Sequence, residues 1–281
     1  MDWSQVFNFT DYDKLLPLVT NSLLAGALLA LIGGMVGVFV MTRELSFAVH
    51  GIAELSFAGA AIFLLIGLDV VLGSVFGSII AAAIIAFLGE RAKDRNSIVA
   101  VLMPFGLGLG ILALSLYPGR AANKFGLLTG QIVAVDDPKL ASMAVITAIV
   151  LVAMLLIWRP LSFSSLDPEV AAARGVPTKA LGIVFVMLLG LSVAAAVQIV
   201  GALLVLALLV TPAAAALRLS SSQLWVPILS VIFAMIAMIG GTLLALGGTL
   251  PISPYVTTIS FLIYLMARLV AFAKSRPEVR S

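Results

Sequence analysis

The chain contains no cysteine and only one histidine. The missing cysteines exclude disulfides, thiolate metal ligands and thiol catalysis together. The single histidine leaves one imidazole for any role as a base or a ligand. Charge is also scarce, because Asp, Glu, Lys and Arg make up only 10% of the 281 residues. A soluble domain of this length carries about 25% charged residues, so the composition excludes an ordinary soluble protein.

Apolar residues instead make up 62% of the chain. A helix needs ~20 mostly apolar residues to cross the hydrocarbon core of a bilayer, and the sequence contains many such runs. The fold class is therefore an all-α integral membrane protein, a bundle of about eight or nine transmembrane helices in a single domain over residues 1–281. The predicted spans are Leu16–Met41, Ser46–Leu68, Val70–Gly89, Ser97–Tyr117, Leu140–Trp158, Ala180–Ile199, Gly201–Leu217, Trp225–Leu246 and Pro254–Phe272.

Two places decide how many crossings the chain makes. The run 180–217 is nearly unbroken, and only Gln198 and Gly201 indicate a turn that would divide it into two spans. Within its second half, Pro212 lacks an N–H and should kink the helix. Residues 121–135 are apolar but too short to cross, which predicts a re-entrant or interfacial helix.

The distribution of Lys and Arg supports a topology with the N-terminus outside, because cytoplasmic loops carry the excess of positive charge. Alternating from an outside N-terminus places twelve Lys and Arg inside and four outside. The N-terminal sequence MDWSQVFNFTDYDK lacks the basic start of a cleavable signal peptide, so the first span is expected to direct insertion. The same rule explains the net charge of +3 without nucleic acid as a partner.

The run MTRELSFAVHGIAELSFAGAA places two ionisable groups, His50 and Glu54, in otherwise apolar sequence. They are four residues apart and so share one face of a helix. Ionisable groups at membrane depth usually face a cavity, a partner or a substrate path, and imidazole with carboxylate suits a divalent cation such as zinc or manganese. A pair that hydrogen-bonds within the bundle explains the spacing equally well. Arg43, at the start of the run, is expected to anchor it at the cytoplasmic interface.

A predicted cytoplasmic loop at about 159–179 reads RPLSFSSLDPEVAAARGVPTK and contains signals for a short helix. Asp167 can cap the helix, Pro168 suits its first position, and Glu169 favours the positive end of its dipole. Gly175 can close its C-terminus. Such a helix could transmit force at the membrane surface, and a plain surface loop with one helical turn is the alternative.

Three stretches resemble the permease subunits of zinc, manganese and iron ABC importers, the ABC-3 family: residues 43–59, LSFSSLDPEVAAARGVPTKAL, and VGALLVLALLVTPAAAA at 200–216. The resemblance covers nearly the whole chain and implies a permease domain with a fold like that of type II ABC importers. It also implies that Asp167, Pro168, Glu169, Ala172 and Gly175 belong to a coupling helix that docks on the ATPase.

The family pattern usually reads Arg, then Asp seven residues later, His four after that and Gly five further on. The matching positions here are Arg43, His50, Glu54 and Gly59, so the imidazole and the carboxylate exchange places. The resemblance implies that the pair handles the metal transiently along the translocation path. It further implies two ATPase copies, a second permease that is identical or closely related, surrounding lipid and an extracellular metal-binding protein. The metal, manganese or zinc, is cargo, and no cofactor is permanently bound.

The sequence has no Gly-x-x-x-x-Gly-Lys-Ser/Thr loop, so the chain is expected to be a transport subunit and not an enzyme, with ATP hydrolysed by a partner. The expected location is the plasma membrane of a prokaryote. Two transport alternatives remain open: an ABC permease for an iron chelate or vitamin, and an ion-coupled secondary metal transporter. An intramembrane hydrolase is disfavoured, because the chain has no His-Glu-x-x-His pair and no Gly-x-Ser-x-Gly elbow.

Overall fold

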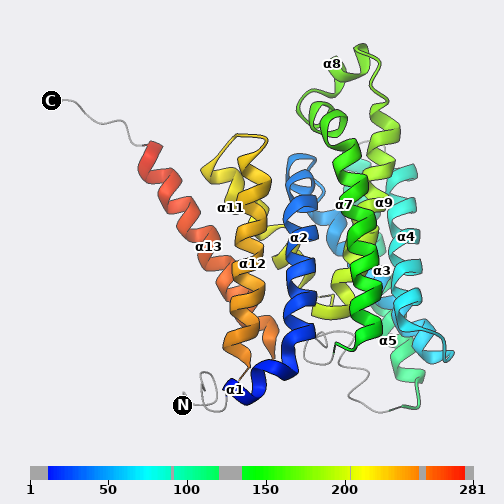
Figure 1. The fold of residues 1–281 in the computed structure, drawn as a ribbon. Helices are drawn as coiled ribbons and strands as arrows, with labels where there is room; N and C mark the ends of the chain where they lie inside the picture. Colours follow the sequence, from blue (N-terminus) through cyan, green and yellow to red (C-terminus); the bar gives the residue numbers. More distant parts are fainter. Residues whose placement is uncertain (1–11, 90–91, 120–134, 203, 247–250, 276–281) are drawn as a thin grey trace.

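The computed structural model describes residues 12–89, 92–119, 135–202, 204–246 and 251–275, and all the regular elements within these ranges are helices (Figure 1). Eight helices in the described part of the chain are long and apolar enough to cross a membrane. The predicted all-α membrane fold is therefore confirmed. The elements are α1 (Tyr12–Leu15), the 3-10 helix η2 (Leu16–Val19), α2 (Thr20–Thr42), α3 (Ser46–Leu65), α4 (Val70–Leu88), α5 (Ala92–Leu116), α7 (Asp137–Leu166), α8 (Pro168–Ala173), α9 (Thr178–Val200), α10 (Val205–Leu209), α11 (Thr211–Leu219), α12 (Trp225–Ala245) and α13 (Ile252–Ser275).

The predicted span 201–217 is a broken helix and not one continuous span. α9 stops at Gly201, whose φ of +76° suits glycine. α10 then ends at Leu209, and α11 starts at Thr211 with Pro212 in its first turn. A proline at this position ends one helix and begins the next, since it has no N–H for the preceding turn.

The broken segment nevertheless brings the chain back across the bundle. α9 begins beside the end of α2, where a β-carbon on Gly182 would lie 3.5 Å from Arg43 Nη2. Its 23 residues reach about 35 Å, so it ends at the opposite side. α12 begins beside the end of α2 again, because Val226 packs in one cluster with Val38. Residues 201–224 must therefore make the return crossing.

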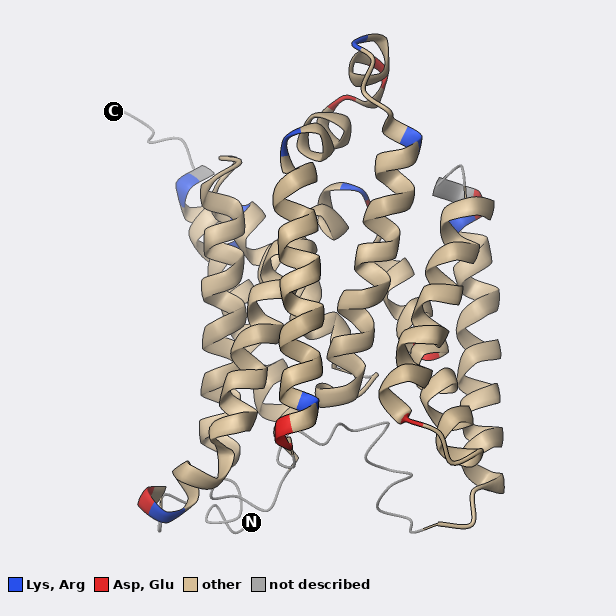
Figure 2. Ribbon diagram, turned by 45° about the vertical axis from the view of Figure 1, so that its right-hand side comes forward, with Lys and Arg blue, Asp and Glu red and all other residues tan. Residues whose placement is uncertain are grey.

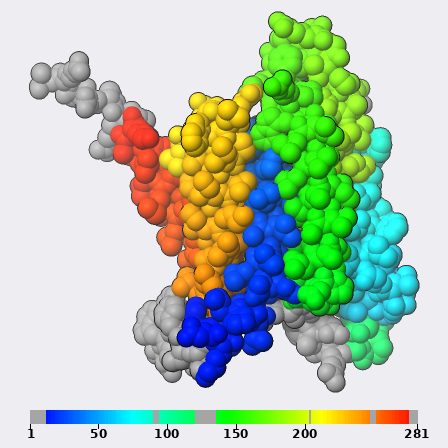
Figure 3. Space-filling model, viewed as in Figure 1, coloured from blue at the N-terminus to red at the C-terminus, as the bar shows by residue number. Residues whose placement is uncertain are grey.

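Charged residues are concentrated at the two ends of the bundle, and few lie between them. Lys, Arg, Asp and Glu gather toward the ends of the helices in Figure 2. α1 and the last turn of α13 lie at opposite ends, as an odd number of crossings requires (Figure 1). α8 lies beyond the ends of the other helices on the side where α13 finishes, and it forms a projection in the space-filling view (Figures 1 and 3). We call this side the α8 end; it is the side predicted to be cytoplasmic.

The segment around α8 is shorter than the predicted loop at 159–179. α7 continues through Pro160 to Leu166, and α9 already begins at Thr178. The added turns of α7 are held by burial, since Leu161 is fully buried and Ser164 is nearly so. Only residues 167–177 therefore separate the two long helices. Residues 121–134 of the predicted re-entrant segment lie outside the described residues.

Candidate metal-handling pair and coupling helix

His50 and Glu54 lie in the first half of α3, on successive turns of the helix. The distance from His50 Nε2 to Glu54 Oε1 is 3.7 Å, which is too long for a hydrogen bond. The side chain of His50 is 25% exposed and that of Glu54 only 5%. The imidazole therefore reaches the surface of the single chain, while the carboxylate lies behind it.

Each of the two side chains has a polar atom without a partner in the described part of the chain. His50 Nδ1 and Glu54 Oε2 are both buried without a hydrogen-bond partner within the described residues. Buried polar atoms in proteins are nearly always paired, so an unpaired one calls for a reason such as a missing ion or water. A sealed, hydrogen-bonded His–Glu pair would not leave these atoms free.

Close packing fixes the backbone that carries the pair. A β-carbon on Gly106 of α5 would lie 3.0 Å from the carbonyl carbon of Glu54, and one on Gly51 would lie 2.8 Å from Val99 Cγ1. One turn beyond the pair, Gly59 lies directly against the backbone of Gly73 on α4. Small residues that let helix backbones approach in this way are typical of membrane bundles. The two side chains therefore project from a rigid helix.

One chain offers only these two ligands at the pair. Among the described residues there is no group of three or more His, Asp or Glu that could hold a metal ion. Nε2 of Gln198, near the end of α9, is also buried and has no hydrogen-bond partner in the ranges that the structure describes. The sequence had indicated only a turn at this position.

Arg43, predicted to anchor the run at the cytoplasmic interface, also contacts two other helices, α7 and α9. It follows the last residue of α2, and its Nη1 donates to Ser164 Oγ at 3.2 Å and to Ser165 Oγ at 3.1 Å. Its guanidinium carbon lies 6.0 Å from the ring centre of Phe185 on α9. Burial, and secondarily the charge of Arg95, lowers the pKa of Arg43, although a guanidinium stays protonated. Arg43 thus ties α2 to the end of α7 and to α9.

The serines that hold Arg43 follow it by 121 and 122 residues. No spacing within the local run 43–59 could have indicated them. Only the polar cluster in LSFSSLDPEV offered a signal that the end of α7 accepts hydrogen bonds.

α8 is capped at both ends as the sequence predicted. Asp167 Oδ1 accepts a hydrogen bond from Val170 N at 3.0 Å, and Pro168 occupies the first turn. At the other end Gly175 has φ of +81°, and its N–H bonds to Ala172 O at 2.9 Å.

The following N–H, of Val176, bonds to Ala171 O at 3.0 Å, which completes a Schellman motif. Ala171 faces inward and is fully buried, whereas Ala172 is exposed. The helix is thus independently capped and presents one face outward.

Comparison with known proteins places these features in a family. The model of the ABC 3 transport family matches residues 16–271. The manganese transport system membrane protein MntC of Halalkalibacterium halodurans is 29% identical over 233 residues, which cover 82% of this chain and 80% of that protein. The high-affinity zinc uptake system membrane protein ZnuB of Haemophilus influenzae is 24% identical over 225 residues, or 80% of this chain and 86% of that protein.

The fold is also that of a solved transporter. PsaBC from Streptococcus pneumoniae, in complex with Fab, superposes with a TM-score of 0.82 over 94% of this chain and 99% of that chain, at 23% identity. An inward-facing ABC transporter of metal-chelate type gives a TM-score of 0.72 at 18% identity, over 91% of this chain and 85% of that chain. Because the family match spans nearly the whole described bundle, this multi-pass membrane chain belongs to the ABC 3 transport family.

Proposed function

We propose that the chain is the permease subunit of an ATP-binding-cassette importer for a divalent metal ion, manganese or zinc, in the plasma membrane of a prokaryote. The observation that carries this proposal is the His50–Glu54 pair, which lies in an apolar run and has one buried nitrogen and one buried oxygen that no described residue hydrogen-bonds. The relatives named for manganese and zinc transport support the choice of cargo.

The pair can hold one ion between its two groups. Zinc lies about 2.0–2.2 Å from imidazole nitrogen and carboxylate oxygen, so two ligands of one ion can be at most about 4.4 Å apart. The observed 3.7 Å between Nε2 and Oε1 falls inside this limit. Two ligands bind weakly, which suits a path that must release the ion on the other side.

A second permease would complete the coordination. Zinc prefers about four ligands, and hard divalent ions prefer about six. Two copies of this chain that face each other across an axis would bring two imidazoles and two carboxylates to one path. The partial exposure of His50 at the surface of one chain is consistent with that arrangement.

α8 is the proposed contact with the ATPase. It projects beyond the other helices, it is capped at both ends, and its exposed residues Ala172 and Ala173 leave room for a partner surface. In the proposed cycle, ATP binding closes two ATPase copies, the α8 helices move, and the bundle changes the side to which the pair is open. An extracellular metal-binding protein delivers the ion.

The pair also favours a bare ion over the alternatives. A chelate or vitamin needs a wide, weakly charged path, whereas this chain places a carboxylate and an imidazole one turn apart. A secondary transporter has no need for a separately capped helix beyond the membrane. Both alternatives share the all-α fold, so the fold alone does not choose among them.

Uptake of ⁵⁴Mn and ⁶⁵Zn by proteoliposomes that contain the assembled transporter tests the proposal. We expect His50→Ala and Glu54→Ala each to lower uptake by at least roughly 10–100-fold, the loss that follows when only an outer-shell partner of a metal ligand is removed. Thr147→Val is the matched control, because Thr147 is also buried in a spanning helix with an unpartnered oxygen, and uptake should be unchanged. Normal uptake in both variants of the pair would refute the proposed role.

A further inference from the structure

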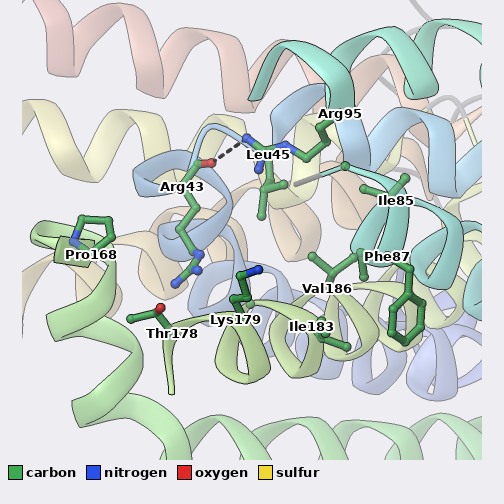
Figure 4. A pocket seen from close by; sticks show the side chains of 13 residues that line it. Arg43, Leu45, Ile85, Phe87, Arg95, Pro168, Thr178, Lys179, Ile183 and Val186 are labelled. Atoms are coloured by element: carbon green, nitrogen blue, oxygen red, sulfur yellow. Dashed lines mark hydrogen bonds between the residues drawn. The ribbon is translucent and has the colours of Figure 1, made fainter. Parts of the chain in front are cut away.

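A cavity of about 420 Å³ opens at the α8 end of the bundle, apart from the His50–Glu54 pair. It lies where the end of α2, the end of α4, the start of α5, the start of α8 and the start of α9 meet (Figure 4). Three cations line it: Arg43, Arg95 and Lys179. Among the described residues that line it there is no carboxylate.

The two arginines are held in place by the fold. Arg95 Nη2 donates to the carbonyl oxygen of Arg43 at 3.3 Å, as the dashed line in Figure 4 shows. Arg95 Nε is buried without a hydrogen-bond partner among the described residues. Glu44 attracts Arg95 electrostatically, but it does not line the cavity. The described residues thus give the cavity three cationic side chains, and they leave the Nε of Arg95 without an acceptor.

The rest of the lining forms an apolar wall, which continues onto the outer surface of the bundle. Ile85, Phe87, Ile183 and Val186 form it, and Phe87 is 62% exposed. Since this wall lies at the ends of spanning helices, it borders the level where lipid headgroups meet acyl chains. A cavity that is lined by both cations and apolar side chains suits a molecule with an anionic head and an apolar tail.

We propose that this cavity binds a phosphate group, supplied by the headgroup of an anionic phospholipid such as phosphatidylglycerol. Guanidinium groups bind phosphate through charge-assisted hydrogen bonds, and basic pockets between helices on the cytoplasmic side bind such headgroups. Pro168, at the start of α8, lines the same cavity. A bound lipid would therefore contact the helix proposed to couple transport to the ATPase.

The test measures which lipids the assembled transporter retains. The complex is purified into detergent, exchanged against an equal mixture of phosphatidylglycerol and phosphatidylcholine, and analysed by native mass spectrometry. Wild type should retain phosphatidylglycerol. Lys179→Gln should lower the apparent affinity roughly fivefold, and Arg95→Gln with Lys179→Gln roughly 25-fold, since each Lys or Arg near the membrane surface contributes about 1 kcal/mol.

Two further variants separate charge from folding. Gly182→Leu fills the cavity and keeps all three cations; a β-carbon at Gly182 makes only an ordinary contact, 3.5 Å from Arg43 Nη2. This variant should also lose the lipid. Arg218→Gln removes an exposed arginine in the last turn of α11, away from the cavity lining, and should retain it.

Three results would overturn the proposal. The first is equal retention of phosphatidylglycerol by wild type and by all the cavity variants. The second is displacement of the lipid by millimolar inorganic phosphate, which would make a free anion the natural occupant and not a lipid. The third is that the variants Lys179→Gln and Arg95→Gln with Lys179→Gln lose the ATPase from the purified complex but retain as much lipid as wild type. This result would assign the three cations to the ATPase contact.

Discussion

Gly59 of α3 and Gly73 of α4 lie back to back, so that a β-carbon on Gly59 would overlap the carbonyl oxygen of Gly73. A β-carbon on Gly73 would in turn lie 2.5 Å from the carbonyl oxygen of Gly59. The contact closes α3 and α4 against each other one turn beyond Glu54. It gives a physical reason for glycine at position 59, the last of the four positions that match the family pattern.

We predict that Gly59→Ala destabilises the chain by about 1–3 kcal/mol, because overpacking forces the two helix backbones apart. Gly108→Ala is the matched control, since Gly108 also lies within a spanning helix but a β-carbon there meets nothing within 4 Å. Thermal unfolding in detergent, followed by size-exclusion chromatography, measures both. Equal midpoints for the two variants would show that the close contact does not hold α3 and α4 together.

We predict that Asp167→Ala weakens α8 by about 0.5–2 kcal/mol through the loss of its cap. Asp167→Asn keeps an oxygen that can accept from Val170 N and should behave like wild type. The readout is the number of metal ions transported per ATP hydrolysed in the reconstituted complex, which Asp167→Ala should lower. If Asp167→Asn lowers this number as much as Asp167→Ala does, then the charge of Asp167 matters and its cap does not.

We predict that Ala172→Arg leaves the bundle folded but uncouples ATP hydrolysis from transport. Ala172 is exposed on α8, so a large side chain costs the permease nothing internally but would block a docked surface. Gln223→Arg adds the same charge to the exposed loop between α11 and α12 at the α8 end and should stay coupled. Normal coupling in Ala172→Arg would remove α8 from the ATPase interface.

We predict that exchanging the two groups of the pair preserves transport. The double variant His50→Glu with Glu54→His keeps one imidazole and one carboxylate on the same turns, in the order closer to the usual family pattern. Its metal uptake should exceed that of either single variant, a positive coupling that a double-mutant cycle reports. Additive losses would mean that the two side chains act independently.

The spans were predictable because apolar length alone defines them. Eight of the nine predicted runs form long helices, and the ninth breaks where Pro212 indicated a kink. α7 extends past Pro160 because Leu161 and Ser164 are buried against distant elements, and a local pattern does not record such packing.

The site was predictable only where the local sequence defines it. His50 and Glu54 stand out as ionisable residues in an apolar run, and the caps of α8 follow local rules. The contacts of Arg43 with Ser164 and Phe185 depend on how α7 and α9 pack. The three cations of the cavity come from α5, α9 and the end of α2, and only the fold brings them together.

The most direct measurement is a metal-binding titration of the purified permease in detergent, with Mn²⁺ and Zn²⁺ as the ligands and Glu54→Gln beside wild type. Glu54→Gln keeps the size of the side chain and removes its charge. The account predicts saturable binding by wild type and binding by the variant that is weaker by at least roughly 10–100-fold, the loss known for outer-shell partners of metal ligands. Equal affinity in the two proteins for both metals would contradict the role assigned to the His50–Glu54 pair.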